Sequence, residues 1–187
     1  MEVEKEVRYS VSQRSWDLAL KNSSEYRPKV EMLDITMGAY GRESVLKTGL
    51  VFRVRKKPTK ITLEIKKRIA GGWNEESIEI DSVERGINFL SLAGLEPYLY
   101  IARTREVRLY KGLKIFFDDI ELLGKYIEIE YQDSKDSQNE IKEFCALCDI
   151  LGEEQPLYGE IINAKYDEDK AFRSIFESRL QELISTN

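Results

Sequence analysis

The sequence predicts an α+β protein built on one antiparallel sheet that curls or closes, with helices inserted between the strands and after them. Three observations support this. Eight segments alternate apolar and polar residues with period two, the pattern of half-buried strands. Lys57, Pro58 and Thr59 separate two of these segments by a hairpin-length connection. Other segments carry apolar residues at helical spacing. The alternation by itself leaves open whether the sheet is a barrel or a curled open sheet.

The expected elements follow from these patterns in chain order. The strands are predicted at 2–11, 27–37, 49–56, 60–69, 74–81, 98–109, 113–119 and 124–132. Ser12 is expected to cap a helix at about 13–22, and 38–48, rich in glycine and polar residues, is expected to be a loop or turn. A second helix is expected from Ser82 to Ala93. The tail is predicted to form helices at about 137–150 and 168–185, the latter capped by Asp167.

Length and charge exclude several classes of protein. The 187 residues fit a single domain, 1–187, with a sizeable core. The net charge of −5 argues against a general nucleic-acid binder. No segment has the apolar length of a membrane span, and the N-terminus lacks the apolar core of a signal peptide. We therefore expect no nucleic-acid or membrane partner and a cytoplasmic location.

The sequence contains no histidine, which excludes histidine-based triads and HExxH zinc sites. A bound metal would therefore be held by carboxylates, which favours hard ions such as magnesium, manganese or calcium. Cys145 and Cys148 form a lone CxxC within an apolar periodic segment. A redox or zinc site is one interpretation, but zinc would need two more ligands, so we interpret both cysteines as helix-packing residues.

The polar faces of the predicted strands carry charges of both signs. A solvated outer face is the ordinary explanation for any one strand. It weakens here because an alternating charged pattern recurs in at least five strands. Acidic pairs bind hard cations, and arginine pairs match phosphate oxygens. The charged rows are Glu2, Glu4, Glu6 and Arg8; Arg53 and Arg55; Glu64 and Lys66; Glu75 and Glu79; Arg103 and Arg105; Asp118; and Glu128 and Glu130.

An ordered set of motifs resembles the CYTH (triphosphate tunnel metalloenzyme) superfamily from residue 2 to about 132. Glu4-x-Glu6-x-Arg8 resembles its ExExK motif with arginine for lysine; a register starting at Glu2 would put Glu6 in the lysine position. The other matching segments are 52–55 (FRVR), 63–66 (LEIK, with glutamate for the usual threonine), 103–105 (RTR) and 117–130 (FDDIELLGKYIEIE). A further departure is 34–37 (DITM), where relatives often have an aromatic residue after the aspartate.

The resemblance implies an eight-stranded antiparallel β-barrel, the triphosphate tunnel, over 2–132, with flanking helices and a helical tail at 137–185. It implies a magnesium or manganese cofactor bound by Glu4, Glu6, Glu128 and Glu130, which would also be the catalytic residues, with Asp118 and Glu79 as further metal candidates. It implies that the phosphates are bound by Arg8, Arg53, Arg55, Lys66, Arg103 and Arg105.

The resemblance also implies the reaction, with alternatives that the sequence leaves open. The first is metal-dependent hydrolysis of inorganic triphosphate (tripolyphosphate) or another small triphosphate such as ATP or thiamine triphosphate. A class IV-type adenylyl cyclase making cyclic AMP and a non-catalytic polyphosphate- or nucleotide-binding module are the alternatives. No motif specifies an adenine or ribose pocket, which favours the hydrolase. The sequence does not distinguish a monomer from a homodimer.

Overall fold

The computed structural model describes residues 4–69, 72–132 and 134–186. The chain divides into two compact units. Unit 1 comprises Met1–Glu31 and Arg103–Leu157, and unit 2 comprises Met32–Ala102 and Tyr158–Asn187. Among the described residues, no helix is long and apolar enough to cross a membrane. The expectation of a single domain over 1–187 stays a prediction.

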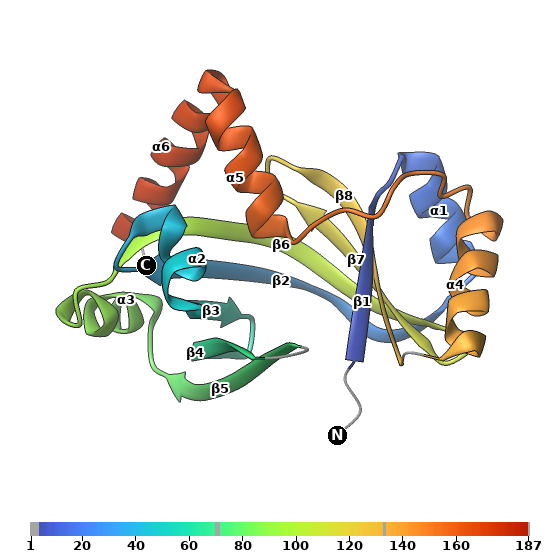
Figure 1. Ribbon diagram of the computed structural model, residues 1–187, viewed down its shortest axis with the longest axis horizontal. Coiled ribbons are helices and arrows are strands. Elements are labelled where there is room, and N and C mark those ends of the chain that lie inside the picture. Colours follow the sequence, from blue (N-terminus) through green and yellow to red (C-terminus); the bar gives the residue numbers. More distant parts are fainter. Residues whose placement is uncertain (1–3, 70–71, 133, 187) are drawn as a thin grey trace. The chain divides into compact units, whose positions relative to one another are not determined.

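Eight strands form the sheet, as the alternating segments predicted (Figure 1). They are β1 (Glu4–Ser10), β2 (Ser24–Gly38), β3 (Leu50–Lys57), β4 (Lys60–Ile69), β5 (Gly72–Ile80), β6 (Glu96–Tyr110), β7 (Leu113–Ile120) and β8 (Gly124–Gln132). Their order is β1-β8-β7-β6-β2-β3-β4-β5. Within unit 1, β8 pairs antiparallel with β1 and β7, and β7 with β6; within unit 2, β3 pairs antiparallel with β2 and β4, and β4 with β5. The α+β class and the antiparallel sheet are confirmed.

The helices are α1 (Gln13–Lys21), the 3₁₀ turn η1 (Gly41–Glu43), α2 (Ser44–Thr48), α3 (Val83–Leu92), α4 (Lys135–Leu147), α5 (Tyr158–Glu168) and α6 (Lys170–Thr186). Helix α1 begins directly after Ser12, its predicted cap, and α3 lies within the segment 82–93 that was predicted to be helical, with Ser82 as its cap. The hydroxyl of Ser12 accepts a hydrogen bond from the Ser15 amide, and that of Ser82 accepts one from the Arg85 amide, both at 3.1 Å. Each cap satisfies an amide that has no partner inside the helix.

The prediction of a loop over 38–48 is wrong in part, because this segment contains η1 and α2. Ser44 is buried, and its hydroxyl accepts a hydrogen bond from the Tyr40 amide at 2.9 Å. A Cβ atom on Gly38 would lie 2.1 Å from that hydroxyl oxygen. Glycine is therefore needed for this close packing, rather than for an open loop.

The predicted cap of the last helix is also wrong. Asp167 lies inside α5, and the side chain of Asp169 accepts from the amides of Ala171 and Phe172 at the start of α6. Helix α5 itself was not expected. The two aspartates lie two residues apart, and the sequence pattern alone does not show which of them ends one helix and begins the next.

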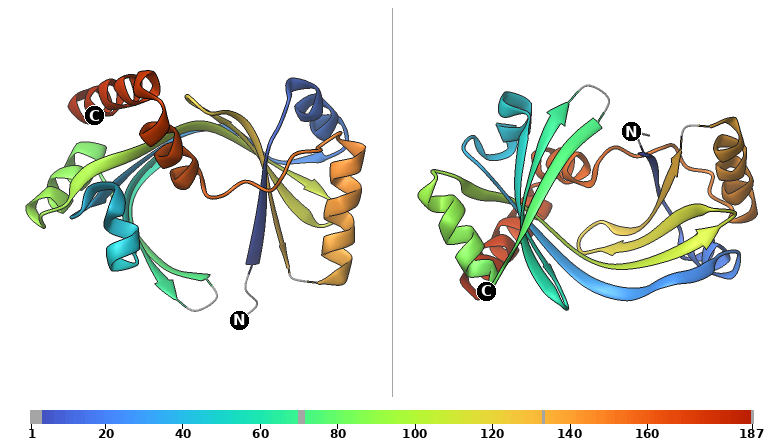
Figure 2. Two further views of the ribbon diagram at one scale, coloured as in Figure 1. Left: turned by 45° about the horizontal axis from the view of Figure 1, so that its top comes forward. Right: turned by 90° about the horizontal axis from the view of Figure 1, so that it is seen from below.

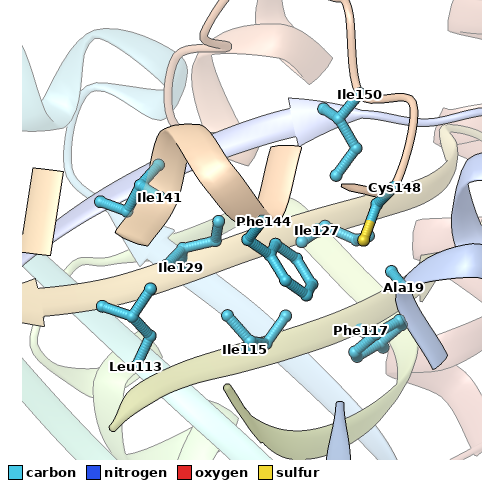
Figure 3. Close-up of a cluster of buried hydrophobic side chains, with 10 residues drawn as sticks. All are labelled: Ala19, Leu113, Ile115, Phe117, Ile127, Ile129, Ile141, Phe144, Cys148 and Ile150. Atoms are coloured by element: carbon cyan, nitrogen blue, oxygen red, sulfur yellow. The ribbon is translucent and has the colours of Figure 1, made fainter. Parts of the chain in front are cut away.

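The core of unit 1 lies between one face of β7 and β8 and the helices α1 and α4 (Figures 1 and 3). Ile127 and Ile129 alternate with polar neighbours along β8 and point into this core. Cys148 belongs to it and Cys145 packs against it, so the interpretation of both as packing residues is confirmed. Burial raises the pKa of both thiols, that of Cys148 to about 11, which keeps them protonated near neutral pH.

In unit 2, β3, β4 and β5 form a meander on which α3 packs (Figure 2). Helix and sheet approach closely at Gly86, where a Cβ atom would lie 2.6 Å from Ile80 Cδ1 and 2.9 Å from Val54 Cγ2. Helices α5 and α6 contact each other, and the ring of Phe176 in α6 stacks on Tyr100 of β6 with centroids 4.7 Å apart.

The unit 1 core predicts a large stability difference between two positions of one helix. Phe144 is fully buried, and Phe144→Ala is expected to lower the free energy of unfolding by about 3–5 kcal/mol, because it removes contacts and leaves a cavity. Leu147, three residues on, is 47% exposed, and Leu147→Ala is the matched control with a cost below about 1.5 kcal/mol. Urea unfolding of both variants measures this, and equal costs would contradict the proposed core.

Candidate functional site

The charged residues of unit 1 lie on the sheet face opposite its apolar core. Side chains alternate along β8, so Glu128 and Glu130 point away from the face of Ile127 and Ile129. In the β1–β8 register Arg8 is opposite Glu128, and Glu6 is opposite Glu130. Directly opposed residues share a face and lie within reach of each other. The register thus brings together residues from the first and last strands.

Arg8 forms hydrogen bonds through all of its guanidinium nitrogens and is only 5% exposed. Its Nε and Nη2 donate to Glu128 Oε2 at 3.0 and 2.6 Å. Nη2 also donates to Glu6 Oε1 at 2.7 Å, and Nη1 donates to the Pro156 carbonyl at 3.2 Å. Every nitrogen of the guanidinium group therefore has a partner, and the group holds two carboxylates close to one another.

A second ion-pair group surrounds Asp118, which is fully buried. Arg105 Nε donates to Asp118 Oδ1 at 2.6 Å, and Arg105 Nη2 lies 3.3 Å from Glu128 Oε1. Arg103 Nε lies 3.8 Å from Asp118 Oδ1. Glu128 thus joins the pairs of Arg8 and Arg105 into one network. We call the set Glu6, Arg8, Arg103, Arg105, Lys114, Asp118, Glu128 and Glu130 the unit 1 charged face; Lys114 and Glu130 form a further ion pair in it.

Unit 2 has a charged face of its own, centred on two arginines of β3. Arg55 donates to both oxygens of Asp34, at 2.6 and 2.9 Å. Arg53 Nε donates to Glu64 Oε2 at 2.8 Å, and Arg55 Nη1 lies 3.5 Å from the same oxygen. The unit 2 charged face comprises Asp34, Arg53, Arg55, Glu64, Lys66 and Glu75, of which Lys66 and Glu75 pair with each other.

A family model described as the CYTH domain matches residues 2–156 of this chain. The match covers most of the sequence and contains the charged residues of both units. The chain belongs to the CYTH domain family. This confirms the resemblance seen in the sequence motifs. A comparison with curated protein sequences gave no match.

Several solved structures share the fold of this CYTH protein. A conserved hypothetical protein from Pyrococcus furiosus superimposes with a TM-score of 0.66 at 18% identity, over 84% of this chain and 98% of its own. The PH1819 protein from Pyrococcus horikoshii gives 0.65 at 24% identity, over 87% and 99%. The adenylyl cyclase candidate HpAC1 from Hippeastrum, for which a dominant triphosphatase activity is described, gives 0.64 at 17%, over 87% and 94%. At these identities the likeness concerns the fold.

The four-glutamate metal cluster implied by the resemblance stays a prediction. The side chain of Glu4 lies outside the described part of the structure. Among the described residues, no three acidic or cysteine side chains are placed to hold one metal ion together. Glu6 and Glu128 instead share Arg8, and Glu130 pairs with Lys114. The CYTH protein thus presents these carboxylates as partners of its own cations.

Glu79, a further metal candidate, is opposite Thr62 in the β4–β5 register and therefore lies on the same face of the unit 2 sheet as Glu64 and Glu75. It is exposed and lines a hollow of about 540 Å³ at the β3–β4 turn, together with Lys56, Lys57 and Lys60. Burial lowers the pKa of Lys57, and the neighbouring positive charges of Arg55 and Lys60 lower it further. The hollow therefore combines several lysines with few carboxylates, which does not favour a cation there.

Four charged residues of these faces were not predicted as site residues: Lys114, Asp34, Glu64 and Glu75. Lys114 lies four residues before Asp118 on the same face of β7, but the apolar Phe116 between them interrupts the alternating charged pattern. Asp34 lies in a run of buried residues that reads as apolar on both faces. A lone carboxylate in such a run requires a cationic partner, and that was the available signal. Glu64 and Glu75 were noted as members of charged rows, and Glu64 also as a departure from the family motif, but neither was assigned a role.

Glu64 is ionised under ordinary conditions despite its burial. Burial raises the pKa of this carboxyl, but Arg53 and Arg55 with their hydrogen bonds outweigh it and hold the pKa below the ordinary value of 4.5. Thr62 contributes a further hydrogen bond, at 2.9 Å to Oε1. The negative charge of Glu64 is therefore part of the folded state.

This depressed pKa predicts how stability changes in acid. A carboxyl with a lowered pKa in the folded state contributes stability above its unfolded pKa of about 4.5, and the contribution is lost as the pH falls through the folded value. Glu64→Gln is expected to lower stability at pH 7, and its stability should then fall less steeply than wild type below about pH 4.5. Urea midpoints across this range measure the difference. Parallel curves for both proteins would contradict the assigned ion pair.

Proposed function

We propose that this CYTH protein is a divalent-metal-dependent hydrolase of inorganic triphosphate or another small triphosphate. The observation that carries the proposal is the set of largely buried arginines, Arg8, Arg53, Arg55, Arg103 and Arg105, on the charged strand faces of a CYTH chain. Guanidinium groups with defined orientations are suited to phosphate oxygens, because each presents several donors in a fixed plane. The described triphosphatase activity of HpAC1, which shares the fold, is consistent with the proposal.

The arginines and Lys66 are proposed to bind the phosphate chain. Their carboxylate partners fix the guanidinium planes before a ligand arrives, which lowers the entropic cost of binding. Arg55 illustrates this, since Asp34 accepts from two of its nitrogens and leaves the third directed toward Glu64. Phosphate oxygens could then accept from donors that are already oriented. The charge that develops on the phosphates during cleavage would be stabilised by the same donors.

A magnesium or manganese ion is proposed as cofactor, and the donor chemistry fits it. Glu6 and Glu128 have carboxylate oxygens around the same guanidinium group, and the backbone register places Glu130 opposite Glu6. Carboxylate oxygens are the ligands that these hard ions prefer. Glu6, Glu128 and Glu130 would hold the ion with Glu4; Asp118, enclosed by Arg103 and Arg105, is the weaker candidate. When bound, such an ion neutralises phosphate charge and acidifies a water molecule.

The proposed reaction needs no nucleophile from the protein. A water oxygen forms a bond to the terminal phosphorus, the bond to the bridging oxygen breaks, and pyrophosphate leaves with the electron pair. The water proton passes to solvent or to the leaving group. The arginines orient the phosphate chain of the substrate and stabilise its negative charge. Neither role requires a histidine, and the sequence contains none. A cyclase would use the ribose 3′-hydroxyl of ATP in place of water.

The proposal predicts substrate preference and products. Because recognition depends on the phosphate chain, kcat/KM for tripolyphosphate should exceed that for ATP by at least about tenfold, or roughly 1.4 kcal/mol in transition-state stabilisation. Product analysis should find orthophosphate and pyrophosphate from tripolyphosphate, with activity lost on chelation of the metal. Cyclic AMP as the main product from ATP would favour the cyclase. Binding of tripolyphosphate without turnover of either compound would favour a binding module.

A second prediction tests the metal-binding carboxylates. Glu130→Gln removes one charge without changing shape and should lower kcat/KM for tripolyphosphate by at least about tenfold in the presence of magnesium or manganese. Glu106→Gln is the matched control, because Glu106 is similarly buried and also forms an ion pair in unit 1, with Arg108, but lies on the other face of β6. Glu130 is preferred to Glu128, whose removal would leave buried Arg8 without its main partner. Normal turnover of Glu130→Gln would remove Glu130 from the proposed site.

A further inference from the structure

Glu64 occupies the donors of Arg53 that a phosphate group would need. Both Nε and Nη2 of Arg53 donate to one oxygen of Glu64, Oε2. Arg55 lies 3.5 Å from that oxygen as well. A carboxylate and a phosphate oxygen compete for the same guanidinium edge, since both accept from two parallel N–H groups. In this structure the edge is filled by the protein's own anion.

Asp34, the other carboxylate beside the two arginines of the unit 2 charged face, is held differently from Glu64. Asp34 uses both oxygens on Arg55 and is almost completely buried, so it is a fixed orienting partner. Glu64 concentrates its ion pairs on one oxygen, while its other oxygen accepts from the Thr62 hydroxyl. A Glu64 carboxylate that released Arg53 would therefore keep a hydrogen bond. Its longer side chain also has more rotatable bonds with which to move than that of aspartate.

We propose that Glu64 is a resident counter-ion that an incoming phosphate group must displace from Arg53, so that it positions Arg53 and weakens the binding of metal-free polyphosphate. The inference rests on the phosphate-binding role proposed for Arg53 and Arg55. Displacement places a second anion beside the ionised Glu64, and the two repel each other. A divalent cation that accompanies the phosphate compensates this repulsion. Glu64 thereby couples the affinity for phosphate to the presence of the cation.

The direction of the mutational effect separates this role from a structural one. If Glu64 only orients Arg53, its removal should weaken ligand binding. If Glu64 competes with the ligand, its removal should strengthen binding even though the folded protein becomes less stable. The sign of the change in affinity therefore decides between the two roles, and it does so without any catalytic assay.

The experiment measures the binding of inorganic tripolyphosphate by titration calorimetry, in chelator and then in magnesium. Glu64→Gln is expected to bind metal-free tripolyphosphate at least about tenfold more tightly than wild type, or roughly 1.4 kcal/mol. The gain from magnesium should be smaller in the variant than in wild type. Glu76→Gln is the control, because it makes the same charge change at an exposed position of the neighbouring strand β5 and should bind like wild type.

Equal or weaker metal-free binding by Glu64→Gln overturns the inference, as does a wild-type affinity that magnesium leaves unchanged. Glu64→Thr removes the same charge with a smaller side chain and must give the same sign. Circular dichroism confirms that each variant is folded before titration.

Turnover of tripolyphosphate is measured separately from binding. Tighter metal-free binding by Glu64→Gln, together with no hydrolysis by the wild-type protein, would support the role of Glu64 and refute the proposed hydrolase. Hydrolysis by the wild-type protein, with no change of affinity in Glu64→Gln, would support the hydrolase and refute the role of Glu64.

Discussion

Moving a guanidinium ion from water into a protein interior costs several kcal/mol unless an anion compensates it, and both units of this protein are built around that compensation. In unit 1, Glu128 joins the pairs of Arg8 and Arg105. In unit 2, Asp34 and Glu64 surround the two arginines of β3. Because these pairs link neighbouring strands, a change in strand register would separate the charges. The ion pairs therefore favour the same register as the apolar contacts.

The apolar face of the strands contributes the folding free energy that the charged face does not. Ile115, Phe117, Ile127 and Ile129 are buried against α1 and α4, and Val54 and Leu63 are buried in unit 2. Burial of apolar area is the main source of folding free energy, whereas a buried ion pair roughly offsets its own desolvation. The helices thus stabilise the sheet from one side, and the opposite side is left for chemistry.

The pairing of the arginines with the protein's own carboxylates bears on the function proposed for this CYTH protein. Arginines that already have carboxylate partners are well oriented, but they are not free donors. Under the proposed function, a polyphosphate ligand would exchange with those carboxylates or bring a cation that satisfies them. The proposed metal and phosphate binding would then be linked through the protein's own ion pairs. Asp34 holds Arg55 with both oxygens, whereas Glu64 uses one oxygen on Arg53, so the two carboxylates would contribute differently.

Local rules in the sequence determined the strands, the Ser12 cap and the charged rows, because period-two alternation and capping depend only on near neighbours. The family followed from motifs in those rows. Local rules failed where the partner is distant. Arg8 and Glu128 lie 120 positions apart, so only the β1–β8 register shows that they pair. Likewise, Asp34 lies in a run of apolar residues and Glu64 in a charged row, and only the fold shows that the arginines of β3 are their partners. Electrostatic pairing depends on distance in space, which the tertiary structure alone decides.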